Sequence, residues 1–123
     1  MIISSLNISG AALVIVAMAS AIFPGAVGGP KTFKGRIAVG GSAEHYIEFK
    51  GGDTATVEVF CYELCTVTMY RPDGSITFSK DASDNFDDGY EITIDSYPRD
   101  NTVYKTVIKS KAKEEFGYSL KTN

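Results

Sequence analysis

From residue 31 onward, apolar and polar side chains alternate with a period of two, and glycine- or proline-bearing turns interrupt the alternation at short intervals. Successive side chains of a β-strand point to opposite faces, so this period places one face of each short strand in a core. No stretch of helical length shows the 3.6-residue period of an amphipathic helix. The chain is therefore constrained to sheets that bury one face.

The alternation predicts about eight strands, and two sheets are needed to cover their apolar faces. We expect an all-β fold: a two-sheet antiparallel β-sandwich, jelly-roll-like in connectivity, with a closed barrel as the alternative. Between two of the strands, Pro72 presets φ and Gly74 accepts a left-handed conformation, which predicts a tight turn. The predicted inward residues are Phe33, Ile37, Val39, Ile47, Phe49, Val57, Val59, Cys61, Cys65, Val67, Met69, Ile76, Phe78, Tyr90, Ile92, Ile94, Tyr104, Thr106, Ile108, Tyr118 and Leu120.

The first 30 residues contain no Asp, Glu, Lys, Arg or His, and their centre is apolar. A secretory signal has such an apolar stretch followed by a small-x-small cleavage site, although the usual positively charged start is missing here. Two such sites occur: Ala17-Met18-Ala19 and Ala19-Ser20-Ala21. We divide the chain into 1–30, a signal peptide or hydrophobic anchor, and 31–123, the β-sandwich domain. A retained anchor or assembly helix and a buried core helix remain alternatives.

The charged residues define which partners to expect. The 123-residue chain has 12 Lys and Arg, 15 Asp and Glu, and a net charge of −3, and all of these residues follow position 30. A nucleic-acid partner is not expected, because such a protein needs a basic face. Four lysines give the late strands a basic edge, which could dock an anionic polymer or a partner's acidic loop, or could blunt an exposed edge strand. They are Lys105, Lys109, Lys111 and Lys113.

Both cysteines, Cys61 and Cys65, occur in the stretch VFCYELCTVTMYRPDGS. If the strands before and after Tyr62-Glu63-Leu64 pair as a hairpin, the two residues face each other with Cα atoms about 4.5 to 5.5 Å apart, which a disulfide can span. We expect this disulfide, which would require the oxidising environment that an export leader implies. Two unpaired buried cysteines, a redox pair, and a metal site with His45 are the alternatives.

An acidic stretch, KDASDNFDDGYE, is the candidate metal site. Clustered oxygen ligands on a loop can hold Ca²⁺, so we consider calcium as a cofactor, with a solvated acidic loop as the alternative. The spacing is not that of an EF-hand, because Phe86 takes a ligand position. The candidate ligands are Asp81, Asp84, Asn85, Asp87 and Asp88.

No catalytic constellation emerges, and we predict that the protein is not an enzyme. His45, the single histidine, begins a strand on the inward side without an identifiable Ser or Cys partner, so we interpret it as structural. The candidate binding surface is a set of outward aromatic residues: Phe60, Tyr62, Tyr70 and Tyr97. Exposed rings suit a protein interface or stacking on sugar faces, and the absence of Trp disfavours carbohydrate.

Three stretches together resemble the bacterial pre-peptidase C-terminal domain, a small secreted β-sandwich appended to exported proteases and other extracellular enzymes. FKGRIAVGGSAEHYIEFKGGDTATVEV matches its opening strands, VTMYRPDGS its strand and turn, and VYKTVIKSKAKEEFGYSLKTN its closing strands. One departure is CYELC, where the family commonly has an acidic Asp-x-Asp-Leu stretch, so any role of those acids is not carried over. The resemblance implies a secreted accessory module.

These observations favour a non-enzymatic exported module, secreted or at the cell surface. It would bind or assemble with a protein or polysaccharide of the cell envelope or extracellular matrix. The first alternative is a subunit of a surface filament or membrane-anchored assembly, in which residues 1–30 are retained and self-assembly occurs. The second is a small secreted hydrolase. Membrane contact is expected only if the amino-terminal segment is retained.

Overall fold

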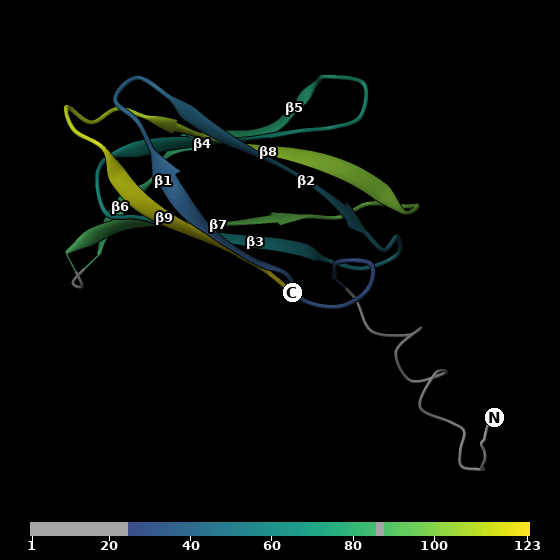
Figure 1. Cartoon of the computed structure of the whole chain (residues 1–123). Helices are drawn as coiled ribbons and strands as arrows, with labels where there is room; N and C mark the ends of the chain where they lie inside the picture. Colours follow the sequence, from purple (N-terminus) through teal and green to yellow (C-terminus); the bar gives the residue numbers. More distant parts are fainter. Residues whose placement is uncertain (1–24, 86–87) are drawn as a thin grey trace, which may run out of the picture.

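A computed structural model describes residues 25–85 and 88–123, and every regular element in these ranges is a β-strand (Figure 1). All the strands expected from the alternation are present, together with the short strand β6. No helix among the described residues is long and apolar enough to cross a membrane. The strands are β1 (Thr32–Ile37), β2 (Ser42–Phe49), β3 (Ala55–Cys61), β4 (Cys65–Tyr70), β5 (Ile76–Asp81), β6 (Ser83–Asn85), β7 (Gly89–Ser96), β8 (Thr102–Ser110) and β9 (Phe116–Thr122).

The strands form two antiparallel sheets that face each other, as Figure 1 shows. One sheet has five strands in the order β1-β9-β3-β7-β6, and the other has four in the order β2-β8-β4-β5. Inward side chains of both sheets meet in a single cluster of buried residues. The predicted two-sheet antiparallel β-sandwich is therefore confirmed.

The connectivity is that of a long hairpin wrapped upon itself. Strand β1 pairs with β9, β2 with β8, β3 with β7 and β4 with β5, so the pairings are nested one inside another. Wrapping the hairpin brings β9 against β3 and β8 against β4. This nested arrangement over two sheets is a jelly roll, as the sequence predicted.

The turn at residues 71–75 forms the tip of this hairpin. Gly74 has φ of 88° and donates its amide to Arg71 O at 2.9 Å, while the Arg71 amide donates to Ser75 O at 2.8 Å. The hydroxyl and the amide of Ser75 both donate to Asp73 Oδ1, at 2.7 and 2.9 Å, and these bonds hold the pKa of that carboxyl below its usual value. The predicted Pro72–Gly74 turn is present and internally hydrogen-bonded.

Two predicted core positions lie on the surface instead. Val39 follows the end of β1 and is 60% exposed. Ile76 is 54% exposed, because a bulge beside Met69 and Tyr70 shifts the register of β5. Without the bulge Tyr70 would face Thr77, but it faces Ile76, so Ile76 joins Tyr70 on the outer face.

Strands β3 and β4 do not form the predicted hairpin. Strand β3 lies between β9 and β7 in one sheet, and β4 lies between β8 and β5 in the other. Residues 62–64 cross between the layers: the Tyr62 amide donates to Gly117 O at 3.0 Å, and the Lys111 amide donates to Leu64 O at 2.9 Å. A hairpin and a layer crossing place the same alternate residues in the core, so the alternation alone did not distinguish them.

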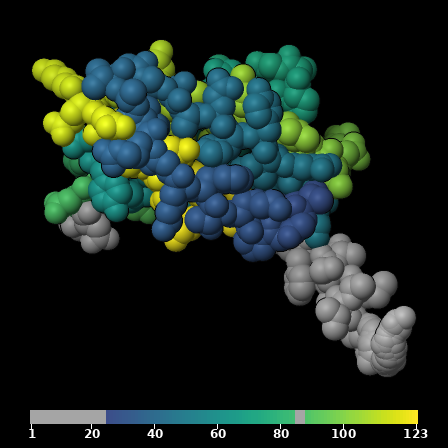
Figure 2. All heavy atoms as spheres, in the orientation of Figure 1, coloured from purple at the N-terminus to yellow at the C-terminus, as the bar shows by residue number. Residues whose placement is uncertain are grey.

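The described chain begins with a short segment, residues 25–27, that joins the two sheets at one end. The Ala26 amide donates to Asn123 O at 3.0 Å, and the Val27 amide donates to Glu48 O at 2.8 Å. Ala26 is buried, and Figure 2 shows the dark atoms of this segment packed against those of β2. The folded part therefore includes residues within the predicted 1–30 segment, while residues 1–24 lie outside the described ranges.

Replacing Leu120 with Ala tests the core. Leu120 is fully buried, and its backbone pairs with Phe33 on one side and Val59 on the other. We expect a loss of about 2 to 5 kcal/mol in the free energy of unfolding, measured by urea denaturation. The control, Val39→Ala at an exposed position, should change it by no more than about 0.5 kcal/mol. Equal midpoints for the two variants would contradict this packing.

Candidate functional site

The outer face of the β2-β8-β4-β5 sheet carries a row of large side chains that crosses all four strands. The register pairs Tyr46 with Lys105, Lys105 with Tyr70, and Tyr70 with Ile76. Tyr46 is 66% exposed, and Ile76 also lies largely in solvent. We call these four residues the aromatic row.

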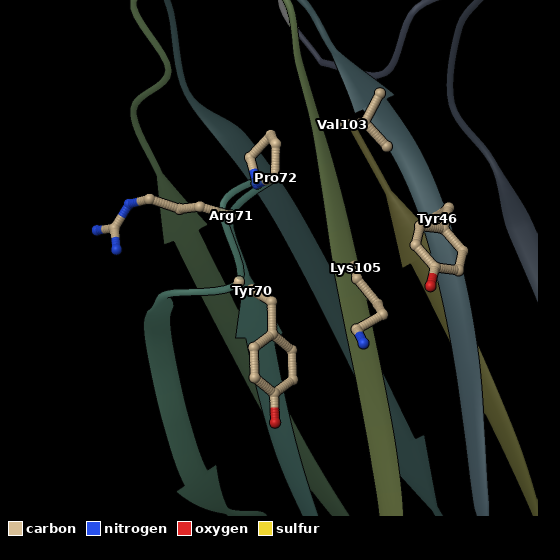
Figure 3. Close-up of a pocket in the computed structure, with 7 residues that line it drawn as sticks. Tyr46, Tyr70, Arg71, Pro72, Val103 and Lys105 are labelled. Carbon is tan, nitrogen blue, oxygen red and sulfur yellow. The ribbon is translucent and has the colours of Figure 1, made fainter.

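A groove runs along β8 between two of these side chains (Figure 3). Tyr46 borders it from β2, Tyr70 and Pro72 border it from β4 and the turn, and Val103 and Lys105 belong to β8 between them. Its volume is about 240 Å³. We call it the β8 groove; its lining residues are Tyr46, Tyr70, Arg71, Pro72, Gly74, Val103 and Lys105.

Lys105 supplies positive charge at the centre of the groove. Its Nζ lies 4.9 Å from the centroid of the Tyr70 ring, a cation–π contact. Within residues 25–85 and 88–123 no carboxylate forms an ion pair with it. The Arg71 guanidinium instead donates to Ser75 Oγ and Ile76 O, at 3.2 and 3.1 Å, and Figure 3 shows it pointing away from Lys105. No lining residue carries a carboxylate.

The structure does not bring together the four aromatic residues that were predicted as a binding surface. Phe60 and Tyr62 contact each other beside the five-stranded sheet, with ring centroids 5.0 Å apart. The Phe60 ring covers Gly89, and Tyr62 lies over Gly117. Tyr97, 73% exposed, lies in the β7–β8 connection. Only Tyr70 of the four lines the groove.

Tyr46 and Val103 line the groove but were not among the residues predicted from the sequence. Both are outward positions of predicted strands, so alternation alone could have marked them as exposed apolar side chains. Their proximity to Tyr70 depends on the order of β2, β8 and β4, which no local pattern contains. The same order corrects the prediction of a basic edge, because β8, which carries Lys105 and Lys109, is an interior strand.

The predicted Cys61–Cys65 disulfide is wrong: both cysteines are free and buried. They end β3 and begin β4, in opposite sheets, and both side chains point inward as expected. The hydrogen bond that the Cys61 thiol donates to Cys65, together with burial, raises the pKa of Cys61, so its thiol stays protonated. The same bond lowers the pKa of Cys65. Both residues are unpaired and pack in the core, which was one of the alternatives.

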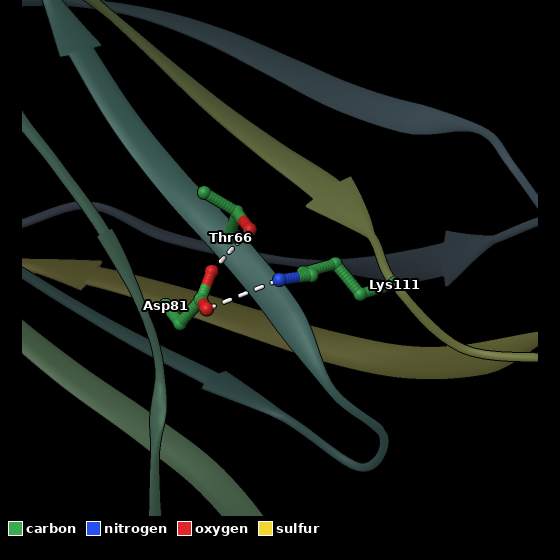
Figure 4. Close-up of polar contacts among 3 residues, drawn as sticks. All are labelled: Thr66, Asp81 and Lys111. Atoms are coloured by element: carbon green, nitrogen blue, oxygen red, sulfur yellow. Dashed lines mark hydrogen bonds and ion pairs between the residues drawn. The ribbon is translucent and has the colours of Figure 1, made fainter.

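The predicted calcium ligands are divided between the two sheets. Asp81 lies in β5, where it accepts hydrogen bonds from Thr66 Oγ1 at 2.7 Å and Lys111 Nζ at 3.1 Å (Figure 4). These contacts lower the pKa of Asp81. Asp84 lies in β6 of the other sheet, beyond the buried Ala82.

The remaining candidates follow Asp84. Asp88 is exposed and has φ of 59°, while Asp87 and the side chain of Asn85 lie outside the described residues. In the part of the chain that the structure describes, no group of three His, Cys, Asp or Glu is placed to hold a metal ion. Calcium binding stays a prediction.

His45 lies on the inward side of β2, half-buried, where it connects the two layers. Its Nε2 and Tyr118 Oη share a hydrogen bond of 2.7 Å, and its ring centroid lies 4.5 Å from that of Phe33. Burial lowers the pKa of His45 and raises that of Tyr118. These contacts tie β2 to β1 and β9 across the sandwich.

No protein-family model matches the chain, and no curated protein matches it. The resemblance to the pre-peptidase C-terminal domain therefore stays a prediction. Among solved structures, the chain is similar to the crystal structure of Yersinia pseudotuberculosis-derived mitogen (YPM), at 18% identity and a TM-score of 0.48, over 77% of this chain and 85% of that one. The fold assignment rests on the strand pairings, and this likeness carries nothing about function.

The lowered pKa of His45 predicts a pH dependence of stability. The folded state disfavours the charged imidazole, so His45 contributes to the free energy of unfolding only while it is neutral. This contribution is fully present above the unfolded pKa of about 6.5 and is lost as the pH falls through the lower folded pKa. Between pH 7 and 5, the free energy of unfolding should fall more steeply for the wild type than for His45→Gln. Urea titrations at each pH measure this, and parallel pH profiles would contradict it.

Proposed function

We propose that the protein is a non-enzymatic binding module that recognises another component of the cell envelope or extracellular space through the β8 groove. The observation that carries this proposal is the aromatic row, in which the register places Lys105 between Tyr46 and Tyr70 and its ammonium has no carboxylate partner among the described residues. Tyr is enriched in interfaces, and contiguous exposed apolar side chains mark interaction sites. A cation held over a tyrosine ring offers both contact area and charge recognition.

The opposite face of the sandwich provides the contrast. One row across the five-stranded sheet contains Thr32, Lys121, Glu58 and Thr93, all polar and exposed. Lys121 there lies between Thr32 and the carboxylate-bearing Glu58 in the register. This row differs in chemistry from the aromatic row, while the rings of Phe60 and Tyr62 lie elsewhere beside the same sheet and contact each other.

The proposed location outside the cell depends on the amino-terminal segment. Residues 1–30 carry no charged side chain and are apolar at their centre, as in an export leader. The resemblance to secreted β-sandwich modules supports the same location. The cysteines give no support for an oxidising location, because they are free. Export is consistent with a module that meets its partner in the envelope or outside it.

A subunit of a surface filament or membrane-anchored assembly is the second candidate. It is favoured by the way residues 25–27 are held to both β2 and the end of β9, so that a retained amino-terminal segment would continue from a firmly attached point. An intact amino terminus in the native protein would favour this candidate, and a chain beginning near Ser20 or Ile22 would favour the free module.

Site-specific photo-crosslinking tests the groove as the binding face. A benzophenone amino acid at position 103, in cells that naturally make the protein, should give discrete heavier species, because Val103 lines the groove. The matched control is position 93, since Thr93 is exposed on the opposite sheet. Identical products from both positions, or none from position 103, would reject the proposal.

A further inference from the structure

The shape of the β8 groove indicates the class of ligand, an inference that rests on the proposed function. Val103 and Lys105 are outward neighbours on β8, two residues apart, so their side chains are spaced by about 6.6 to 6.8 Å along the groove. An extended peptide laid along β8 repeats its side-chain direction at the same interval. The outward side chains of β8 and those of an extended peptide therefore have the same spacing.

The width of the groove supports a single extended chain. Strands β2 and β4 flank β8, and neighbouring strands lie about 4.7 to 4.9 Å apart, so the backbones that bear Tyr46 and Tyr70 are separated by roughly 10 Å. The rings of Tyr46 and Tyr70 border this space on its two sides. An α-helix with its side chains is about 10 to 12 Å across, which is too wide to enter between them.

The charges indicate which kind of ligand side chain fits at each end of the groove. Lys105 Nζ is held against the Tyr70 ring without a carboxylate partner among the described residues, so an incoming carboxylate would gain a charge-assisted contact. Val103 has Glu48 as its backbone partner on the same outer face. A second carboxylate would be repelled there, whereas an aliphatic side chain could contact Val103 and Pro72.

We propose that the β8 groove binds an extended segment of a protein partner in which an aliphatic residue and an Asp or Glu are separated by one residue. The aliphatic side chain packs between Val103 and Pro72, and the carboxylate pairs with Lys105 beside the rings of Tyr46 and Tyr70. The two-residue spacing on β8 selects this separation of the two side chains. Specificity comes from the pairing of one charge with one apolar contact at a fixed separation.

Capped synthetic peptides test the inference with the full chain. The probe peptide carries Leu-x-Asp in a Ser/Thr host; matched peptides carry Leu-x-Lys, or Leu and Asp side by side. Calorimetric titration should show binding of Leu-x-Asp about tenfold tighter than either, the size expected of one charge-assisted contact. Backbone amide shifts in the nuclear magnetic resonance spectrum should centre on Val103 and Lys105.

Charge reversal provides the decisive variant. Lys105→Glu should bind the Leu-x-Lys peptide in preference to Leu-x-Asp, and Lys105→Gln should lose the preference. Lys109→Glu, on the same strand and face but outside the groove, should keep the wild-type preference. Unchanged urea midpoints confirm that the variants fold.

Several results would overturn the inference. They are equal binding of the three peptides, loss of the preference in Lys109→Glu, or binding of an acidic polysaccharide such as polygalacturonate in place of the peptides. Cross-links from position 103 without a peptide preference would reject the ligand class and leave the binding module standing. Absence of those cross-links would reject the binding module itself.

Discussion

The nested antiparallel pairing of the two halves of the chain, folded about the turn at residues 71–75, is the constraint on which the rest of the structure depends. It places β8 between β2 and β4, and so brings Tyr46, Lys105 and Tyr70 into one row although they are distant in sequence. The same wrapping buries one face of each sheet against the other, which removes the apolar side chains from water. The groove on the outside and the core inside are two results of one topology.

Alternation in the sequence predicted the strands and most inward positions, because the direction of a side chain on a strand depends only on its parity. Position 76 was an exception, since the bulge beside Tyr70 changes the parity of β5. Strand pairing was predicted less well, because it depends on residues far apart in the chain. Thus β3 and β4 looked like a hairpin, and the lysines of interior strand β8 looked like an edge.

The short chemical motifs were harder to predict for a related reason. Cys61 and Cys65 flank one crossing between layers, and Asp81 and Asp84 flank another at Ala82. Residues that are close in sequence therefore lie in opposite sheets, and each side chain interacts with its neighbours there. The cysteines remain buried thiols, and Asp81 pairs with Lys111. In the β8 groove, residues that are far apart in sequence lie together, because they come from separate strands. No single sequence motif therefore predicts the groove.

The order of the strands about β8 is the claim that a measurement can test most directly. Nuclear Overhauser contacts between backbone protons of neighbouring strands report pairing without reference to function. We predict contacts from Lys105 to both Tyr46 and Tyr70, and from Val59 to both Ile92 and Leu120. Contacts that pair β3 directly with β4 as a hairpin would contradict the wrapped topology and, with it, the groove.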